Sequence, residues 1–342
     1  MADIAKYKFN SGSNVLPIFE DNYMYEYTDE INSDGTITRT LTANSSPNSI
    51  SFSEMEGLVS VEMIDTTNIT SLSGLFQDCI NLTAVDFNGI NTANVIDMSH
   101  MFNGCSGLLN LDLTGINTSN VLNMDSMFNG CSGLFSLDLN LLNVSKVTSM
   151  NAMFQGCTNI SSFDLSSWNM ANVINMGYLF EGCTNTLSIS FKGLDIPDEA
   201  IMNNIFDNCI VLGAVIMDNC NVADINKVIG VMPMRSANDA NGKLKVNLQD
   251  LSGINREALE AKYWNLASYE IVVRYKFDKS IYANLIPEFN SNFTDYVVLD
   301  EAVEGNIVTR AIGHENLKPT MVRFGSTGYE WEEPNIPKKQ KA

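Results

Sequence analysis

The chain has 342 residues, of which 45% are apolar, so it is long enough to bury a large core or to fold as two or three modules. Its 40 acidic residues outnumber its 20 basic ones, and the resulting net charge of −20 repels the phosphate backbone of nucleic acids. No apolar run approaches the roughly 20 residues that cross a bilayer, so neither a nucleic-acid partner nor membrane insertion is expected.

Residues 1–53 are expected to form a small all-β module. Ser33-Asp34-Gly35 is typical of a turn between strands, because Gly35 can adopt a positive φ. A duplicate of this module is predicted at 271–327, since that stretch repeats the pattern of the first. The matching residues are Tyr7, Phe9, Pro17, Phe19, Arg39 and Phe52 in the first copy and Tyr275, Phe277, Pro287, Phe289, Arg310 and Phe324 in the second. The final residues, 328–342, hold two prolines among charges and are expected to be a mobile tail.

Between the two modules the sequence repeats with a period of 26 residues. The cysteines that mark this period are Cys79, Cys105, Cys131, Cys157, Cys183 and Cys209. A second series precedes each cysteine by three residues: Phe76, Phe102, Phe128, Phe154, Phe180 and Phe206. A fixed period of this length is typical of a solenoid, in which each unit buries its apolar face only against its neighbours.

Two shorter periods lie inside each unit. In the third unit Leu111 and Leu113 alternate with polar residues, which predicts a short strand. The apolar residues from Val121 to Cys131 then recur mostly at steps of three, which predicts one amphipathic helix. The predicted fold is therefore an α/β, leucine-rich-repeat-like solenoid with one parallel strand and one helix per repeat, flanked by the two β modules.

The solenoid is expected to span residues 54–270, including terminal caps. A shortened repeat containing Leu58 and Val61 is predicted to be the N-terminal cap. At the other end, the sequence GKLKVNL at 242–248 predicts a last strand. Asn255 can then cap a helix that begins with Arg256, so the C-terminal cap is placed at about 243–270.

The repeats resemble the BspA-like leucine-rich repeats of bacterial surface antigens. The resemblance rests on the phrases GCSGLLNLDLTGINTSNVLNMDSMFNGCSGL and NVSKVTSMNAMFQGC, and it covers residues 69 to about 217, under half of the chain. It implies a right-handed α/β solenoid belonging to non-enzymatic proteins that bind host or matrix surfaces. It does not identify a ligand.

The cysteines are expected to form a buried column rather than a disulfide framework. Seven is an odd number, and six of them share one place in the repeat, where their side chains should point the same way. No Cys-x-x-Cys pair or histidine cluster accompanies them, so no metal site and no cofactor are predicted. Buried thiols of this kind pack as small apolar groups.

The strand side of the solenoid is the predicted binding face. Asp86, Asp112, Asp138 and Asp164 occupy one place in successive repeats and should face outward as an acidic stripe. Calcium could bridge these carboxylates, or hydrogen bonds from neighbouring Ser, Thr and Asn side chains could relieve their repulsion. The remaining residues predicted for this face are Asn88, Asn110, Thr114, Ser136, Asn140, Ser162 and Ser166.

Two further columns are predicted to be structural. The first is expected to satisfy backbone groups left open by the turn after each strand, and comprises Asn91, Asn117, Asn143, Asn169 and Asn221. The second is expected to end each helix in the left-handed region, and comprises Gly104, Gly130, Gly156 and Gly182.

No nucleophile, phosphate-binding or zinc motif is present, so a non-enzymatic binding or structural protein is expected. The chain begins Met-Ala-Asp-Ile-Ala-Lys without an apolar signal region. Together with the duplicated modules, this favours a phage virion component assembled in the host cytoplasm: a fibre, decoration or receptor-contact protein in contact with other virion proteins. The alternative is a secreted or cell-surface bacterial adhesin. Either would bind a protein or glycan surface ligand, and a homo-oligomer is possible.

Overall fold

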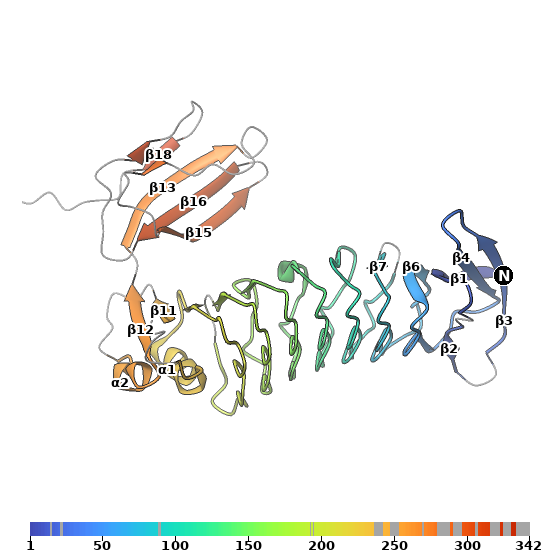
Figure 1. The fold of residues 1–342 in the computed structure, drawn as a ribbon, viewed down its shortest axis with the longest axis horizontal. Helices are drawn as coiled ribbons and strands as arrows, with labels where there is room; N and C mark the ends of the chain where they lie inside the picture. The colour runs from blue at the N-terminus through green and yellow to red at the C-terminus, as the bar shows by residue number, and fades with distance from the viewer. Residues whose placement is uncertain are drawn as a thin grey trace, which may run out of the picture. The chain divides into compact units, whose positions relative to one another are not determined.

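The computed structural model describes residues 1–13, 16–20, 23–87, 90–191, 193, 195–235, 242–246, 253–268, 270–278, 288–289, 296–304, 307–314, 322–323 and 330–332. The side chains of Met63 and of all residues after 266 lie outside this description. The chain divides into two compact units (Figure 1). The first unit comprises Met1–Leu244 and Asp250–Asn265, and the second comprises Lys245–Gln249 and Leu266–Ala342.

The first strand of the chain joins the N-terminal strands to the solenoid. The sheet has the order β3-β4-β1-β6-β7, in which β1 is antiparallel to both β4 and β6, and β6 is parallel to β7. Its strands are β1 (Ala2–Asn10), β3 (Tyr25–Ile31), β4 (Thr36–Ala43), β6 (Leu58–Ile64) and β7 (Ala84–Val85). Two short strands, β2 (Ile18–Phe19) and β5 (Ile50–Ser51), form a separate antiparallel sheet. The open edge of the first repeat strand is thus covered by β1.

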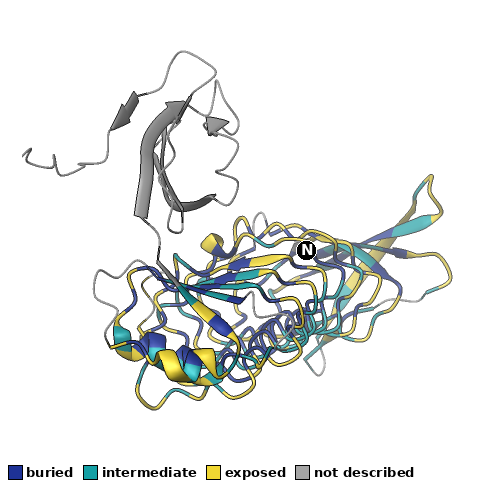
Figure 2. Ribbon diagram, turned by 60° about the vertical axis from the view of Figure 1, so that its left-hand side comes forward, coloured by how far each residue is buried: buried dark blue, intermediate teal, exposed yellow. Residues whose placement is uncertain are grey.

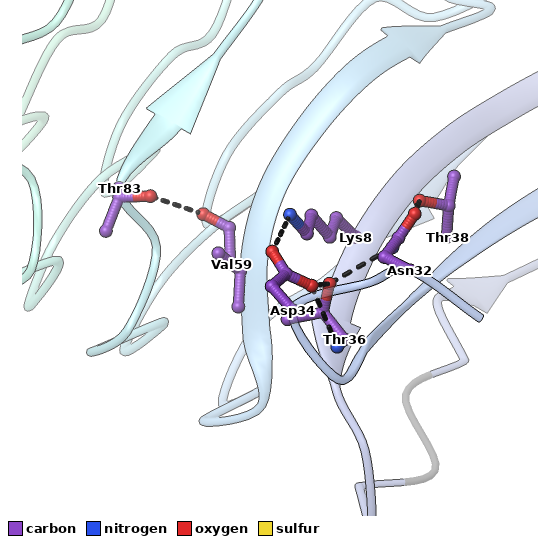
Figure 3. A network of polar contacts seen from close by, with 7 residues as sticks. All are labelled: Lys8, Asn32, Asp34, Thr36, Thr38, Val59 and Thr83. Carbon is purple, nitrogen blue, oxygen red and sulfur yellow. Dashed lines mark hydrogen bonds and ion pairs between the residues drawn. The ribbon is translucent and has the colours of Figure 1, made fainter. Parts of the chain in front are cut away.

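The turn predicted between β3 and β4 is confirmed. Gly35 has a φ of +82°, and Asp34 accepts hydrogen bonds from the amide and hydroxyl of Thr36 (Figure 3). Asp34 also pairs with Lys8 of β1 at 2.7 Å. Further along the hairpin, the buried Arg39 guanidinium makes two 2.7 Å hydrogen bonds to the Asp29 carboxylate.

The repeats stack as coils, each coil being one 26-residue turn of the solenoid (Figure 1). On one side of the coils lie short parallel strands and the Asn110↔Ser136 bridge, here called the strand side. The other parallel bridges, from Ser71↔Asp97 to Asn175↔Ile201, form a separate ladder. The elements of the strand side after β7 are the Asn110↔Ser136 bridge, the 3-10 turn η1 (Leu139–Leu141), β8 (Ser162–Asp164), β9 (Ser188–Ser190) and β10 (Ala214–Ile216). The second sheet of the molecule has the order β12-β11-β10-β9-β8, in which β11 is Gly242–Val246 and β12 is Trp264–Ser268. The parallel strand predicted in each repeat forms only in some coils, as β7, β8, β9 and β10, whereas the coils that contain Asp112 and Asp138 have only the Asn110↔Ser136 bridge.

The helix predicted in each repeat is wrong. Where it was expected, the chain forms consecutive turns, here called the turn side. In the second coil alternate amides donate to carbonyls of the next coil, among them Met98 to Asn123 at 3.0 Å and Phe102 to Met127 at 2.9 Å. The intervening amides close turns within the coil, as Met101 does to Met98. The apolar residues keep a helix-like spacing because a turn also advances by three residues, but the coils hydrogen-bond to one another instead of forming helices.

The core is a file of stacked phenylalanine rings. The rings of Phe102, Phe128 and Phe154 follow one another at 5.7 Å between centroids and are parallel within 5°. The file extends from Phe52 to Phe206, and every member is buried. Phe52 begins it, 5.9 Å from Phe76. Buried positions line the interior of the coils throughout (Figure 2), so the stacking predicted from the 26-residue period is confirmed.

The cysteine column is buried, and none of the seven cysteines, all of which the structure describes, forms a disulfide. Each thiol of the six-member series donates to the carbonyl of a phenylalanine from the preceding coil, as Cys131 does to Phe102 at 3.0 Å. Burial raises the pKa of Cys157 to about 12, so the thiol remains protonated and keeps its hydrogen at neutral pH. The column therefore packs the interior and also satisfies backbone carbonyls.

Two helices and two strands close the solenoid. They are α1 (Val222–Val231), β11 (Gly242–Val246), α2 (Arg256–Glu260) and β12 (Trp264–Ser268). The predicted cap is confirmed at Asn255, whose side chain accepts a hydrogen bond from the Ala258 amide at 3.0 Å, but α2 is shorter than expected. The Lys262 ammonium donates to the carbonyls of Gly230 and Met232 at the end of α1.

The second unit contains a sheet of order β15-β16-β13-β18. Its strands are β13 (Glu270–Asp278), β15 (Tyr296–Glu304), β16 (Ile307–His314) and β18 (Glu330–Glu332), with a separate pair of β14 (Glu288–Phe289) and β17 (Val322–Arg323). Tyr275 pairs with Arg310 as Tyr7 pairs with Arg39. These registers agree with the expected correspondence, while the duplication itself stays a prediction. Within the expected tail, the described residues form β18.

No helix in the described part of the chain combines the length and the apolar character that crossing a membrane requires.

Candidate functional site

The predicted binding residues lie together on the strand side and face solvent. Parallel pairing aligns equivalent residues in neighbouring coils, as in the Asn110↔Ser136 bridge and the Ser162↔Ser188 pair. Ser166 is half-buried, and Asn88 lies outside the described residues. The exposed members are Asp86, Asn110, Asp112, Thr114, Ser136, Asp138, Asn140, Ser162 and Asp164.

The carboxylates of this face are held by their own backbone. The Asp112 Oδ1 accepts a hydrogen bond from the Thr114 amide at 2.9 Å, and Asp138 and Asp164 repeat this contact two residues downstream. The Thr114 hydroxyl and amide lower the pKa of Asp112, so the group stays ionised at neutral pH. Of the two explanations expected for the acidic stripe, hydrogen bonding is the one for which the structure supplies contacts.

The calcium alternative lacks a ligand set among the described residues. Within them, no three carboxylate, histidine or cysteine side chains gather closely enough to hold an ion. One acidic group per coil, separated from the next by the spacing between neighbouring strands of about 4.8 Å, gives a line of single ligands rather than a cage. Such a line suits contacts with a partner that spreads its charges over several coils.

An apolar column beside the acidic stripe was missed by the sequence analysis. It consists of Leu109, Phe135 and Leu187, which are 52%, 57% and 58% exposed. Each of these residues lies three positions before the place of the aspartate in its own coil, and Ser161 holds the corresponding place in the coil between Phe135 and Leu187. The spacing did not reveal their exposure, because these residues are in phase with the inward-facing residues that follow them, as Leu109 is with Leu111 and Leu113.

The asparagine column is structural, as predicted, but its side chains are exposed. Asn117 Oδ1 accepts a hydrogen bond from the Ser119 amide at 3.0 Å, and Asn91, Asn143 and Asn169 make the same contact in their coils. Asn221 differs, because it accepts from the Asp224 amide and caps α1. These residues therefore shape turns and leave the strand side as the candidate site.

The glycine column is left-handed, with φ between 70° and 75°, as expected. It ends a run of turns rather than a helix. Polar side chains on the turn side also pair between coils, as the Asn129 amide does with Gln155 at 2.6 Å. This network was not predicted, and its side chains bond mainly to one another.

Comparison with known families gives one match. The family model described as "Mycoplasma protein of unknown function, DUF285" matches residues 48–135 and 108–218. The two matches together span residues 48–218, half of the 342-residue chain. No curated protein and no solved structure matches the chain. The family match begins just before Phe52, where the file of stacked rings also begins.

Proposed function

The chain belongs to the DUF285 repeat family, and on that premise we propose that it is a non-enzymatic protein whose strand side binds a protein or glycan surface. The observation that carries the proposal is the set of exposed polar side chains repeated coil after coil on one side of a rigid stack. A repeated face of this kind suits an extended ligand, because four successive coils carry an aspartate at the same place.

Most of the repeated residues in each coil have a structural role, and the strand-side aspartates remain for binding. The fixed apolar positions pack the core, the cysteines satisfy carbonyls, and the asparagines shape turns. Asp112, Asp138 and Asp164 use one carboxylate oxygen to accept a backbone hydrogen bond and face solvent, so a ligand can contact them without disturbing the core. Preorganised groups lose little entropy on binding.

Of the two expected settings, the matching strand registers at the two ends of the chain support a virion component. Similar modules suit attachment to a repeated or symmetric surface, such as a particle. Immunogold labelling of purified phage particles tests this setting, and label confined to the bacterial surface would favour the adhesin instead.

The binding role is tested by replacing Asp112 and Asp138 together with asparagine. Asparagine keeps the oxygen that accepts the backbone hydrogen bond, so the free energy of unfolding should change by no more than about 0.5 kcal/mol. Binding of the double variant to glycan and matrix-protein arrays should fall, because two of the exposed charges are lost. Asp207→Asn, on the turn side, is the matched control. Unchanged array binding by the double variant would contradict the proposal.

A further inference from the structure

The strand side combines an apolar column with an acidic column. The apolar column is Leu109, Phe135 and Leu187, and the acidic column is Asp112, Asp138 and Asp164. Two successive coils carry both an apolar residue and an aspartate three positions later, namely Leu109 with Asp112 and Phe135 with Asp138. The next coil extends only the acidic column, with Asp164, and the coil after it extends only the apolar column, with Leu187. Single exposed apolar residues are ordinary on a protein surface, but three in one file beside a file of charges form a two-edged surface.

Backbone contacts hold the two columns straight. The Phe135 amide donates to the Leu109 carbonyl at 3.2 Å, and the Leu187 amide donates to the Ser161 carbonyl at 2.8 Å. The Asn110↔Ser136 bridge and the Ser162↔Ser188 pair align the strand between the columns. Equivalent side chains therefore recur at the strand spacing of about 4.8 Å.

The charge of this surface is not balanced by the protein itself. Among the described residues no lysine or arginine pairs with Asp112, Asp138 or Asp164, and the chain as a whole carries a charge of −20. Each of these carboxylates is fixed by its bond to the backbone amide two residues later. A complementary partner must therefore be cationic along one edge and apolar along the other.

The spacing of the coils selects the conformation of that partner. Successive turns of an α-helix advance by about 5.4 Å, whereas same-face residues of an extended strand are about 6.7 Å apart. Over the two coil steps from Asp112 to Asp164, a helix lying along the column departs by about 1.2 Å and a strand by about 3.8 Å. Flexible lysine side chains can absorb the smaller mismatch.

We propose that these two columns bind a basic amphipathic helix of a partner protein, lying along the stack of coils with its lysine or arginine edge on the aspartates and its apolar edge on Phe135. This inference rests on the proposed binding role of the strand side and specifies its partner. Helix-in-groove recognition of this kind uses residues at i, i+4 and i+7 as anchors.

The probe is a labelled 18-residue peptide with lysines at i, i+4, i+7 and i+11 and a neighbouring leucine stripe. Its control is a peptide of the same composition in scrambled order. Fluorescence anisotropy with the full-length protein should show at least about tenfold tighter binding of the ordered peptide, and circular dichroism should show that it becomes helical on binding. Equal affinity for the scrambled peptide would overturn the inference.

The sharpest variant is Phe135→Ser, because the same column already contains Ser161 and the fold accepts serine there. It should weaken the ordered peptide about tenfold, and Asp138→Asn should reduce the dependence of affinity on salt. The matched controls are Leu122→Ser, at a residue that is 44% exposed and precedes the turn side of its coil, and Asp207→Asn. Equal losses in the controls would contradict the assignment.

The outcomes separate this inference from the binding role itself. If neither peptide binds but the Asp112→Asn, Asp138→Asn double variant still loses array binding, the strand side remains a binding face and the helical partner is wrong. If the double variant also keeps its array binding, both the helical partner and the proposed binding function are wrong.

Discussion

Ala152 lies in a backbone conformation that alanine rarely adopts. Its φ is 55°, and His100 and Ser126 hold the same place in neighbouring coils with φ of 56° and 54°. In the first coil this place belongs to Gly74, also with a positive φ. A side chain in the left-handed region is disfavoured by about 1–2 kcal/mol, so the stack imposes strain at this place to keep its amides directed at the next coil.

Replacing Ala152 with glycine should therefore stabilise the protein. Relief of the left-handed strain exceeds the entropy that glycine adds to the unfolded chain, and we expect a gain of about 0.5–1 kcal/mol in the free energy of unfolding, measured by urea titration. Ala84→Gly, in the extended strand β7, is the control and should lose stability. A loss at both positions would show that Ala152 is not strained.

At the scale of single residues, the sequence reveals some of this geometry. The recurring glycine at Gly104 and its equivalents predicts a positive φ, and the structure confirms this prediction. Ala152 gives no such signal, because its conformation is set by hydrogen bonds to a coil 25 residues away. The acidic stripe could be predicted from its regular spacing, whereas the exposure of Phe135 could not, because Phe135 is in phase with the buried Leu139 and its spacing predicts an inward-facing side chain.

At the scale of elements, the strands and the helices differ in how far the sequence predicts them. The alternation around Leu111 and Leu113 specifies inward and outward faces, and the structure follows it. The spacing from Val121 to Cys131 fits both a helix and a run of turns, and local pattern cannot separate them. The neighbouring coil determines the outcome, because its carbonyls accept hydrogen bonds from every second backbone amide, and these amides therefore need no partner within a helix.

The ring file is the element whose loss should cost most. Phe128→Ala removes a fully buried ring between two stacked neighbours, so we expect a loss of about 3–5 kcal/mol in the free energy of unfolding. Phe135→Ala removes the same side chain from an exposed place in the same coil and should change stability by about 0.5 kcal/mol or less. Similar urea midpoints for the two variants would contradict the packing role of the file.

At the scale of the whole molecule, sequence reasoning separated elements that the fold joins. β1 was assigned to a module that flanks the solenoid, yet it pairs with β6 and lies in the same compact unit as the coils. No local sequence pattern reveals this strand pairing, because the paired residues Ala5 and Ile64 are far apart in the sequence. The period of 26, in contrast, is visible in the sequence because it is repeated.

Deletion of one whole period tests the stack as a unit. Removing residues 131–156 brings Cys157 directly after Gly130, so the remaining coils keep their register. Circular dichroism should show a folded protein with a lower melting temperature, since one set of interfaces is lost. Removing only residues 131–143 breaks the register and should abolish cooperative melting. Comparable melting of the two deletions would mean that the coils do not depend on alignment.

The turn side has a direction. In the third coil, for example, the amides of Met124, Ser126, Phe128 and Gly130 donate toward the C-terminal end of the stack at 2.7 to 2.9 Å, and among the turn-side amides only those of Leu122 and Asn123 donate back to the preceding coil. Peptide dipoles in such an arrangement add from coil to coil as they do along a helix. The turn side therefore carries a net dipole whose positive end lies at its later coils, whereas the strand side, whose amides donate in both directions, adds little to it.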